Sequence, residues 1–332
     1  MFSGGRNSSV NVMARSRIAR FQSLLALAVM VIALSLMSDR FLTMESVRNI
    51  LLQISVNLCL SVGMTLVILT GGIDLSVGAV LGLAGAVAAG LLKNGLPLAW
   101  LHVSLQFTAF GAMVAGVLVG AALGWHNGIL ITRFRLPPFV ATLGMLSIAR
   151  GLTFLWTGGF PITALDPAFV FIGAGFWHGV PMPVWISGAL GVVFYALSRH
   201  TVLGRHIYAV GGSERAAMFS GLNVNRIRMQ VYMLGGALAG VAGVVLAARL
   251  DAADPRAGLG YELDSIAAVV IGGTSLSGGR GSIPGTVLGC LIIGVLNTGL
   301  VLLGVSPFWQ MVVKGYVILA AAALDKAGEK RS

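Results

Sequence analysis

The chain has 332 residues, of which 57% are hydrophobic and only 10% are charged, and its mean hydropathy is +0.91. Soluble domains carry about 25% charged residues, so this composition excludes an ordinary soluble domain and predicts a protein whose main solvent is a lipid bilayer. The formal net charge of +11 would suit a nucleic-acid partner only if the basic residues gathered on one surface.

Apolar stretches long enough to cross a bilayer follow one another along most of the chain. A spanning helix needs about 20 mostly apolar residues, and about ten such stretches occur, the eighth of them short. We therefore expect an all-α integral membrane protein with a single transmembrane domain over 1–332. The predicted spans are 21–37, 49–70, 76–92, 103–124, 138–157, 183–198, 228–248, 264–274, 285–304 and 308–324.

Basic residues gather in the segments that lie on one side of the membrane in this topology. They dominate the amino-terminal tail 1–20, the loop 199–228 and the carboxy-terminal tail 325–332, whereas the segments on the other side hold more acidic residues than basic ones. This asymmetry is the positive-inside pattern. We therefore expect both termini and the loop 199–228 in the cytoplasm, and no binding of nucleic acid.

The stretch 70-TGGIDLSVG places a carboxylate, Asp74, inside an apolar and glycine-rich run. Backbone groups in hydrocarbon must be satisfied internally, so Gly71 and Gly72 predict a break between two helices, buried in protein or lining an aqueous cavity. Asp74 and Ser76 are both good N-cap residues for the helix that follows. A cap explains the residue type, and a direct role of Asp74 in binding a substrate stays open.

Two halves of the chain resemble each other. The stretch 124-GWHNGILITRFRLPPFVATLG is similar to 294-GVLNTGLVLLGVSPFWQMVVKG, and 72-GIDLSVGAVLG is similar to 260-GYELDSIAAVVIGG with one residue of slippage. Spans two to five then correspond to spans seven to ten. Because this offset is odd, the two copies cross the membrane in opposite directions, and such inverted repeats are characteristic of transport proteins.

A second glycine cluster, 272-GGTSLSGGRGSIPG, does not fit a nucleotide-binding loop. A Walker loop closes with Gly-Lys-Ser/Thr, and no lysine of this chain follows a glycine. We expect instead a broken helix between the eighth and ninth spans. Its breaks are predicted at Gly272, Gly273, Gly278 and Gly279.

The side chains give no catalytic or metal-binding constellation. Cys59 and Cys290 both fall in predicted spans and the five histidines are isolated, so their spacing supports neither a disulfide framework nor a metal site. We therefore do not expect an enzyme. The roles of Arg150 and Lys314, which lie within or near spans, stay open.

The loop 199–228 contains the signals of a short capped helix. Ser213 is a good N-cap for a helix over 214–220, and Gly221 fits the C′ position. A helix of two turns is marginal alone in water, so we expect a docking partner to stabilise it.

Four stretches together resemble the permease subunits of bacterial ABC monosaccharide importers of the ribose, xylose and galactose type, within the branched-chain amino-acid and sugar permease superfamily. They are GGIDLSVGAVLGL, NGILITRFRLPPFVATLGMLSIARGL, GRHIYAVGGSERAAMFSGLNVNRIRM and GYELDSIAAVVIGGTSLSGGRGSIPGTVLG. The resemblance runs from about residue 45 to the last span. It implies a fold similar to the type II permease of the cobalamin importer, placed in a bacterial inner membrane.

The resemblance also implies partners. Such a permease works with a second permease (another copy or a sister subunit), two ATP-binding subunits and one periplasmic sugar-binding protein. This chain would bind no cofactor, because ATP and Mg are used by the ATP-binding subunit. The short helix of the loop 199–228 would rest on that subunit through residues that match the family pattern, namely Ser213, Glu214, Ala217 and Gly221. Two positions depart from the family: Ser213 stands where asparagine is frequent, and Asn297-Thr298 stands where Asn-Asn-Gly is common.

Transport of a monosaccharide calls for neutral hydrogen-bonding groups and aromatic rings along a central pathway. The candidates are Gln53, Asn57, Asn127, Phe139 and Asn297, together with Asp74 if its carboxylate reaches the pathway. Three other functions stay open. They are a branched-chain amino-acid permease, an ion-coupled carrier, which would usually need paired intramembrane acids, and an intramembrane enzyme, which no spacing supports.

Overall fold

A computed structural model describes residues 23–98 and 103–329, and most of this part of the chain is helical. Seven of the described helices are long and apolar enough to cross a membrane, which confirms the expected class of helical membrane protein. They are α2 (Met44–Leu69), α3 (Val77–Asn94), α4 (Ala109–Thr132), α5 (Pro138–Thr157), α7 (Met182–His200), α10 (Val224–Leu250) and α12 (Ile283–Leu302).

Shorter helices complete the described chain. The stretch Ser23–Met37 is an apolar helix shorter than the seven, and Pro307–Ala323 is the apolar part of the last helix. The predicted tail 1–20 lies outside the described residues, and the predicted tail 325–332 begins within the last helix. The remaining helices are α6 (Pro167–Ala174), α8 (Val202–Gly212), α9 (Glu214–Phe219), α11 (Tyr261–Ile271) and α13 (Pro307–Glu329).

Short antiparallel strand pairs lie in the connections between helices. They are β1 (Leu96–Leu98) with β2 (Val103–Leu105), β3 (Ile162–Thr163) with β6 (Ala252–Ala253), and β4 (Phe176–Trp177) with β5 (Val180–Pro181).

One predicted span is corrected by these strands. The span placed at 103–124 begins in β2, and its helix starts only at Ala109, where the Thr108 hydroxyl accepts a hydrogen bond from the Gly111 N–H. Hydropathy alone does not separate the apolar residues of a strand from those of the helix that follows.

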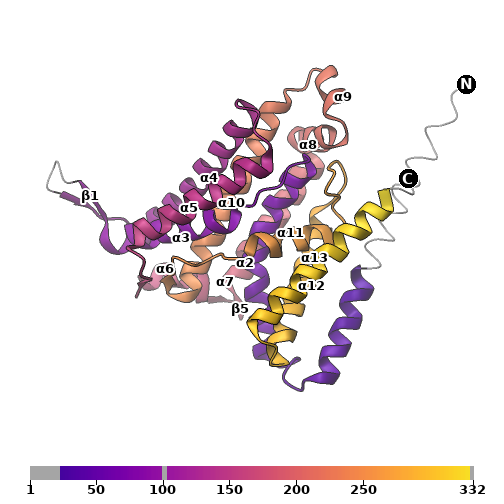
Figure 1. Cartoon of the computed structure of the whole chain (residues 1–332). Helices are drawn as coiled ribbons and strands as arrows, with labels where there is room; N and C mark the ends of the chain where they lie inside the picture. Colours follow the sequence, from indigo (N-terminus) through magenta and orange to yellow (C-terminus); the bar gives the residue numbers. More distant parts are fainter. Residues whose placement is uncertain (1–22, 99–102, 330–332) are drawn as a thin grey trace, which may run out of the picture.

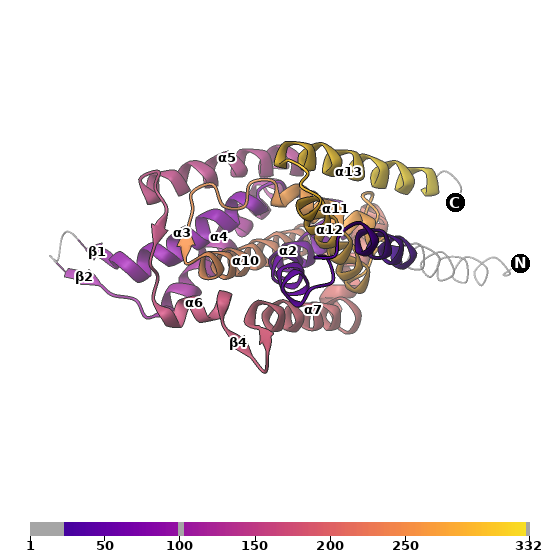
Figure 2. The ribbon, with the colours of Figure 1, turned by 90° about the horizontal axis from the view of Figure 1, so that it is seen from below.

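The helices form three layers. Figure 2 shows α5 and α13 along one side and α6 and α7 along the other, with α2, α3, α4, α10 and α12 between them. The most apolar windows of α2, α3 and α10 are 83%, 78% and 78% buried, against 28% for α5 and 22% for α7. The centre of the molecule is therefore α2, α3 and α10, and α5 and α7 form its periphery. Figure 1 shows α8 and α9 at the opposite end of the bundle from α6.

Glycines bring α4 and α10 into backbone contact. A Cβ atom at Gly120 would collide with the carbonyl oxygen of Gly236, and one at Gly124 would lie 3.0 Å from the Gly236 Cα. Small residues at helix interfaces permit this close approach in membrane proteins. The contact joins helices from the two halves of the predicted repeat.

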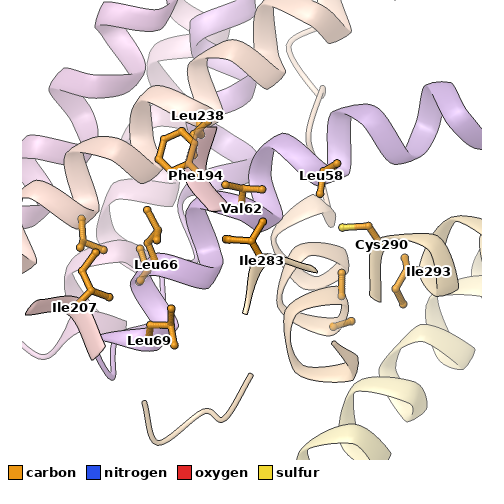
Figure 3. Close-up of a cluster of buried hydrophobic side chains, with 14 of the residues drawn as sticks. Leu58, Val62, Leu66, Leu69, Phe194, Ile207, Leu238, Ile283, Cys290 and Ile293 are labelled. Carbon is orange, nitrogen blue, oxygen red and sulfur yellow. The ribbon is translucent and has the colours of Figure 1, made fainter. Parts of the chain in front are cut away.

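One face of α2 carries the largest apolar cluster. Figure 3 shows Leu58, Val62 and Leu66 on this face, at intervals of four residues, close to side chains of α7, α8, α10 and α12. Lipid tails are as apolar as leucine, so this cluster stabilises the fold through close packing and not through transfer out of water. The residues that α2 contacts include Phe194, Ile207, Leu238, Ile283, Cys290 and Ile293.

Candidate transport site

The break after α2 brings Asp74 into a buried cluster of hydrogen bonds. Asp74 Oδ1 accepts hydrogen bonds from the backbone N–H of Ser76 at 2.8 Å and from its hydroxyl at 2.6 Å. The Asn127 side chain on α4 donates to Ser76 Oγ at 3.0 Å. Asp74 is 1% exposed. The carboxylate therefore closes the turn that leads into α3 and is tied to α4 through Ser76.

The predicted capping role of Ser76 is wrong. Ser76 does occupy the N-cap position of α3, but its hydroxyl makes no capping bond to the helix. It donates instead to Asp74 and accepts from the Asn127 amide. Ser76 also has helical dihedral angles, whereas a residue whose side chain caps the first turn usually has extended ones.

A second buried carboxylate, Asp264 of α11, is held across three helices. Lys314 Nζ on α13 donates to Asp264 Oδ2 at 2.9 Å, and Asn297 Nδ2 on α12 lies 3.5 Å from the same oxygen. The Asp264 and Lys314 side chains are 11% and 27% exposed. The role of Lys314, which the sequence leaves open, is thus to neutralise Asp264 and to hold α13 against α11.

A small polar cavity of about 20 Å³ lies beside this ion pair, between α2, α11 and α12. Asn297 Oδ1 is buried and has no hydrogen-bond partner among the described residues. Gln53 Oε1 lies 3.5 Å from the hydroxyl of Thr298. The cavity is lined by Gln53, Asn57, Tyr261, Asp264, Ile293 and Asn297.

At the end of the bundle that carries α8, the short helix α9 is built as the sequence predicts. The Ser213 hydroxyl accepts from the Ala216 N–H at 3.3 Å, and Gly221 follows the helix with φ +81°. Glu214 points back to α10, where Arg228 donates to both of its carboxylate oxygens at 2.9 and 2.7 Å. Ala217 is buried, whereas the Phe219 side chain is 92% exposed. The ion pair therefore fixes α9 on α10, and an aromatic ring is left facing outward.

Glycines from three segments meet next to this end. The Gly279 N–H donates to the carbonyl oxygen of Leu69 at 3.0 Å. A Cβ atom at Gly211, in the last turn of α8, would collide with that same carbonyl oxygen. Gly71, Gly273, Gly278 and Gly279 all have positive φ, as expected of chain breaks, whereas Gly272 is the C-cap of α11 with an ordinary φ of −67°. The two predicted breaks thus contact each other and α8.

The opposite end joins segments that are distant in the sequence. β3 pairs with β6, so the connections after α5 and α10 form one surface. Arg150 of α5 donates to the carbonyl oxygens of Pro255 and Ala257 at 3.0 and 2.7 Å. Arg150 therefore ties α5 to the connection between α10 and α11, which accounts for a residue that the sequence leaves open.

The predicted pathway residues fall into three groups in the structure. Gln53, Asn57 and Asn297 line one cavity. Asp74 and Asn127 belong to the Ser76 cluster. Phe139 lies on the outer face of α5 with 55% of its surface exposed, away from both.

Sequence reasoning passes over Asp264 as a site residue. It stands in the stretch GYELDS, which is matched to GIDLSVG of the first half, but two residues beyond Glu262, the acid that the match places opposite Asp74. Gly211 has no comparable signal, because its contact with Leu69 depends on how α8 folds back on α2.

Membrane-crossing helices that enclose polar clusters, with an exposed short helix at one end, define the class of the membrane subunit of a transport protein. Residues 46–322 match the family model for the permease component of the branched-chain amino acid transport system. The chain belongs to this family of permeases. No group of three metal-binding side chains occurs among the residues that the structure describes.

Similar proteins cover nearly the whole chain. The chain is 48% identical to the ribose import permease protein RbsC of Escherichia coli strain K12, over 92% of each chain. It is 47% identical to the ribose import permease protein RbsC of Bacillus subtilis strain 168, over 91% of each. It is also 42% identical to the D-allose transport system permease protein AlsC of Escherichia coli strain K12, over 88% of this chain and 86% of that one.

Proposed function

We propose that this protein is the translocating subunit of an ATP-driven importer that carries a monosaccharide, ribose or a close relative, into the cytoplasm. The observation that carries this proposal is the 48% identity to a ribose import permease along 92% of both chains. The central polar cavity, lined by amides and a neutralised carboxylate, suits an uncharged polyhydroxyl substrate better than a zwitterion. The chain itself binds no cofactor, because ATP and Mg are used by the partner ATP-binding subunit.

The helix α9 is the element that we expect to rest on the ATP-binding subunit. Phe219 is exposed at its end, and the Glu214–Arg228 ion pair gives α9 a firm connection to α10. Replacing Phe219 by Ala should weaken co-purification of the ATP-binding subunit. Phe308→Ala, at a residue of α13 that is 80% exposed, is the matched control and should leave it unchanged. Equal recovery of the ATP-binding subunit with both variants would contradict this docking site.

In the membrane we expect ten spans, with Ser23–Met37, α11 and α13 added to the seven long helices, and both termini in the cytoplasm. We also expect α2 to α5 and α10 to α13 to be inverted repeats. Their polar contacts support this relation, because Asn127 reaches the Asp74 cluster in the first half and Asn297 reaches Asp264 in the second. A periplasmic sugar-binding protein would then dock on the surface that contains β3 and β6, and a second permease would complete the pathway.

The test is uptake by the assembled importer. Vesicles would hold this permease with its ATP-binding subunit, and labelled ribose would be supplied on its binding protein. Uptake should stop when ATP is depleted, survive an uncoupler and resist competition by leucine. Loss of uptake with the uncoupler would instead indicate an ion-coupled carrier, and competition by leucine would indicate an amino-acid permease.

A further inference from the structure

The cavity beside Asp264 has the composition of a site for a hydroxyl group. Its volume of about 20 Å³ is close to the space that one water molecule requires. Its polar atoms come from three helices, namely α2, α11 and α12. An oxygen atom of a sugar hydroxyl has the size and the hydrogen-bonding capacity of a water molecule, since it donates one bond and accepts others.

One acceptor of this cavity awaits a donor. Asn297 Oδ1 is buried without a partner among the described residues, and Asn297 as a whole is only 4% exposed. Leaving a buried acceptor without a partner is costly, so an occupant that donates to it is favoured.

The ion pair makes the cavity suitable for a neutral ligand. An isolated carboxylate would favour a cation, but Lys314 Nζ lies 2.9 Å from Asp264 and compensates its charge. What the cavity offers a ligand is therefore hydrogen bonding without a net charge. Asn297 Oδ1 is an acceptor, and the Gln53 and Asn57 amides supply donors on the α2 side.

We propose that this cavity is a hydroxyl-binding subsite within the permease itself. In it, Asn297 Oδ1 accepts the one hydrogen bond that a hydroxyl of the monosaccharide can donate, beside the Asp264–Lys314 ion pair, as the sugar passes between α2, α11 and α12. The inference rests on the proposed transport of a monosaccharide. It adds that the permease holds one sugar hydroxyl at a defined position, in addition to whatever the binding protein recognises.

The experiment is a double-mutant cycle in which a side chain of the permease and a hydroxyl of the sugar are removed, first separately and then together. The assembled importer in vesicles would receive saturating binding protein loaded with ribose or with its 2-deoxy, 3-deoxy or 5-deoxy analogue. In the wild-type importer, one analogue should move about tenfold more slowly than ribose, because one hydrogen bond to a buried acceptor is lost. Asn297→Ala should slow ribose to a similar degree and should not slow that analogue further.

Asn127→Ala is the matched control, since Asn127 is likewise a buried amide on a long helix with an unpartnered Oδ1. It should change the rates of ribose and of all three analogues by one common factor. Gln53→Ala, at a partly exposed residue on the α2 side of the cavity, gives a second reading if Asn297→Ala does not fold, and it should reduce the penalty of the same analogue.

The outcomes separate the two proposals. Failure of the wild-type importer to move ribose or any related monosaccharide would overturn the proposed function. Suppose instead that ribose is transported, but that the rate losses caused by the Asn297 and Gln53 substitutions add in full to the loss caused by removing each hydroxyl. The proposed subsite is then wrong, and the proposed function stands.

Discussion

Asp74 and Asp264 are buried carboxylates, one in each of two matched stretches of the predicted repeat, and the structure satisfies them in opposite ways. Asp74 is satisfied within two residues of itself, by the N–H and hydroxyl of Ser76. Asp264 is satisfied fifty residues away in the sequence, by Lys314 on another helix. An asparagine reaches each site from a neighbouring long helix.

The difference separates a structural site from one whose geometry depends on helix position. The turn around Asp74 stays intact if neighbouring helices shift, because its strongest bonds are local. The Asp264 site changes whenever α13 moves relative to α11, because its counter-charge comes from α13. Of the two sites, only the one at Asp264 is suited to respond to a rearrangement of the helices.

The largest effect is expected for Lys314→Met. It leaves Asp264 in a largely buried place without its counter-charge, and breaking a buried ion pair from one side costs about 3–5 kcal/mol. The partial exposure of Lys314, 27%, places the expected loss near the lower end of that range. Thermal unfolding of the purified importer would measure it.

Two companion variants sharpen this comparison. Adding Asp264→Asn to Lys314→Met should recover most of the lost stability, because the unpaired charge is removed. Asp74→Asn alone should cost less than Lys314→Met, because an asparagine side chain still accepts the Ser76 N–H. If Asp74→Asn proved the more damaging change, the assignment of Asp74 as the locally satisfied site would be overturned.

A smaller effect is expected from Gly120→Ala, which tests the packing between the two halves of the predicted repeat. The added methyl group would collide with the backbone of α10 at Gly236, and overpacking of this kind costs about 1–3 kcal/mol. Gly144→Ala on α5 is the control, because a Cβ atom there meets nothing within 4 Å. It should be neutral or slightly stabilising, since alanine favours a helix over glycine by about 1 kcal/mol.

The unfolding temperatures of these two glycine variants give the measurement. A loss of stability at Gly144 equal to that at Gly120 would mean that the approach of α4 to α10 is not what makes Gly120→Ala destabilising.

Most of the fold was within reach of the sequence because the bilayer imposes it. The long apolar runs became α2, α3, α5, α7, α10 and α12 with only small shifts of their ends. The start of α4 was misplaced because β2 is as apolar as a helix end. The helix α6 lies between two predicted spans and is not among the predicted helices, although Asp166 and Pro167 carry the signals of a helix start.

The candidate site was predictable only where one local motif decides it. The turn around Asp74 and the capped helix α9 depend on neighbouring residues, and the sequence pointed to both. The ion pair of Asp264 with Lys314 and the contact of Gly211 with Leu69 join residues 50 and more than 100 positions apart. Such pairs follow from how helices pack, which composition and spacing do not specify.

The smallest expected effect compares two serines at the starts of α3 and α11. Ser76→Ala removes the hydroxyl that joins Asp74 to Asn127, while the Ser76 N–H still closes the turn. The expected loss is about 1–2 kcal/mol, because two internal hydrogen bonds are lost. Ser265→Ala removes a hydroxyl that donates only to the carbonyl oxygen of Glu262 in its own helix, so it should cost less. Thermal unfolding of Ser76→Ala and Ser265→Ala would measure these two losses. Unfolding of Asn127→Ala, alone and combined with Ser76→Ala, would measure the coupling between Ser76 and Asn127. If the Ser76 and Asn127 losses add in full, the hydrogen bond between them contributes nothing, and the first carboxylate is even more self-contained than its contacts indicate.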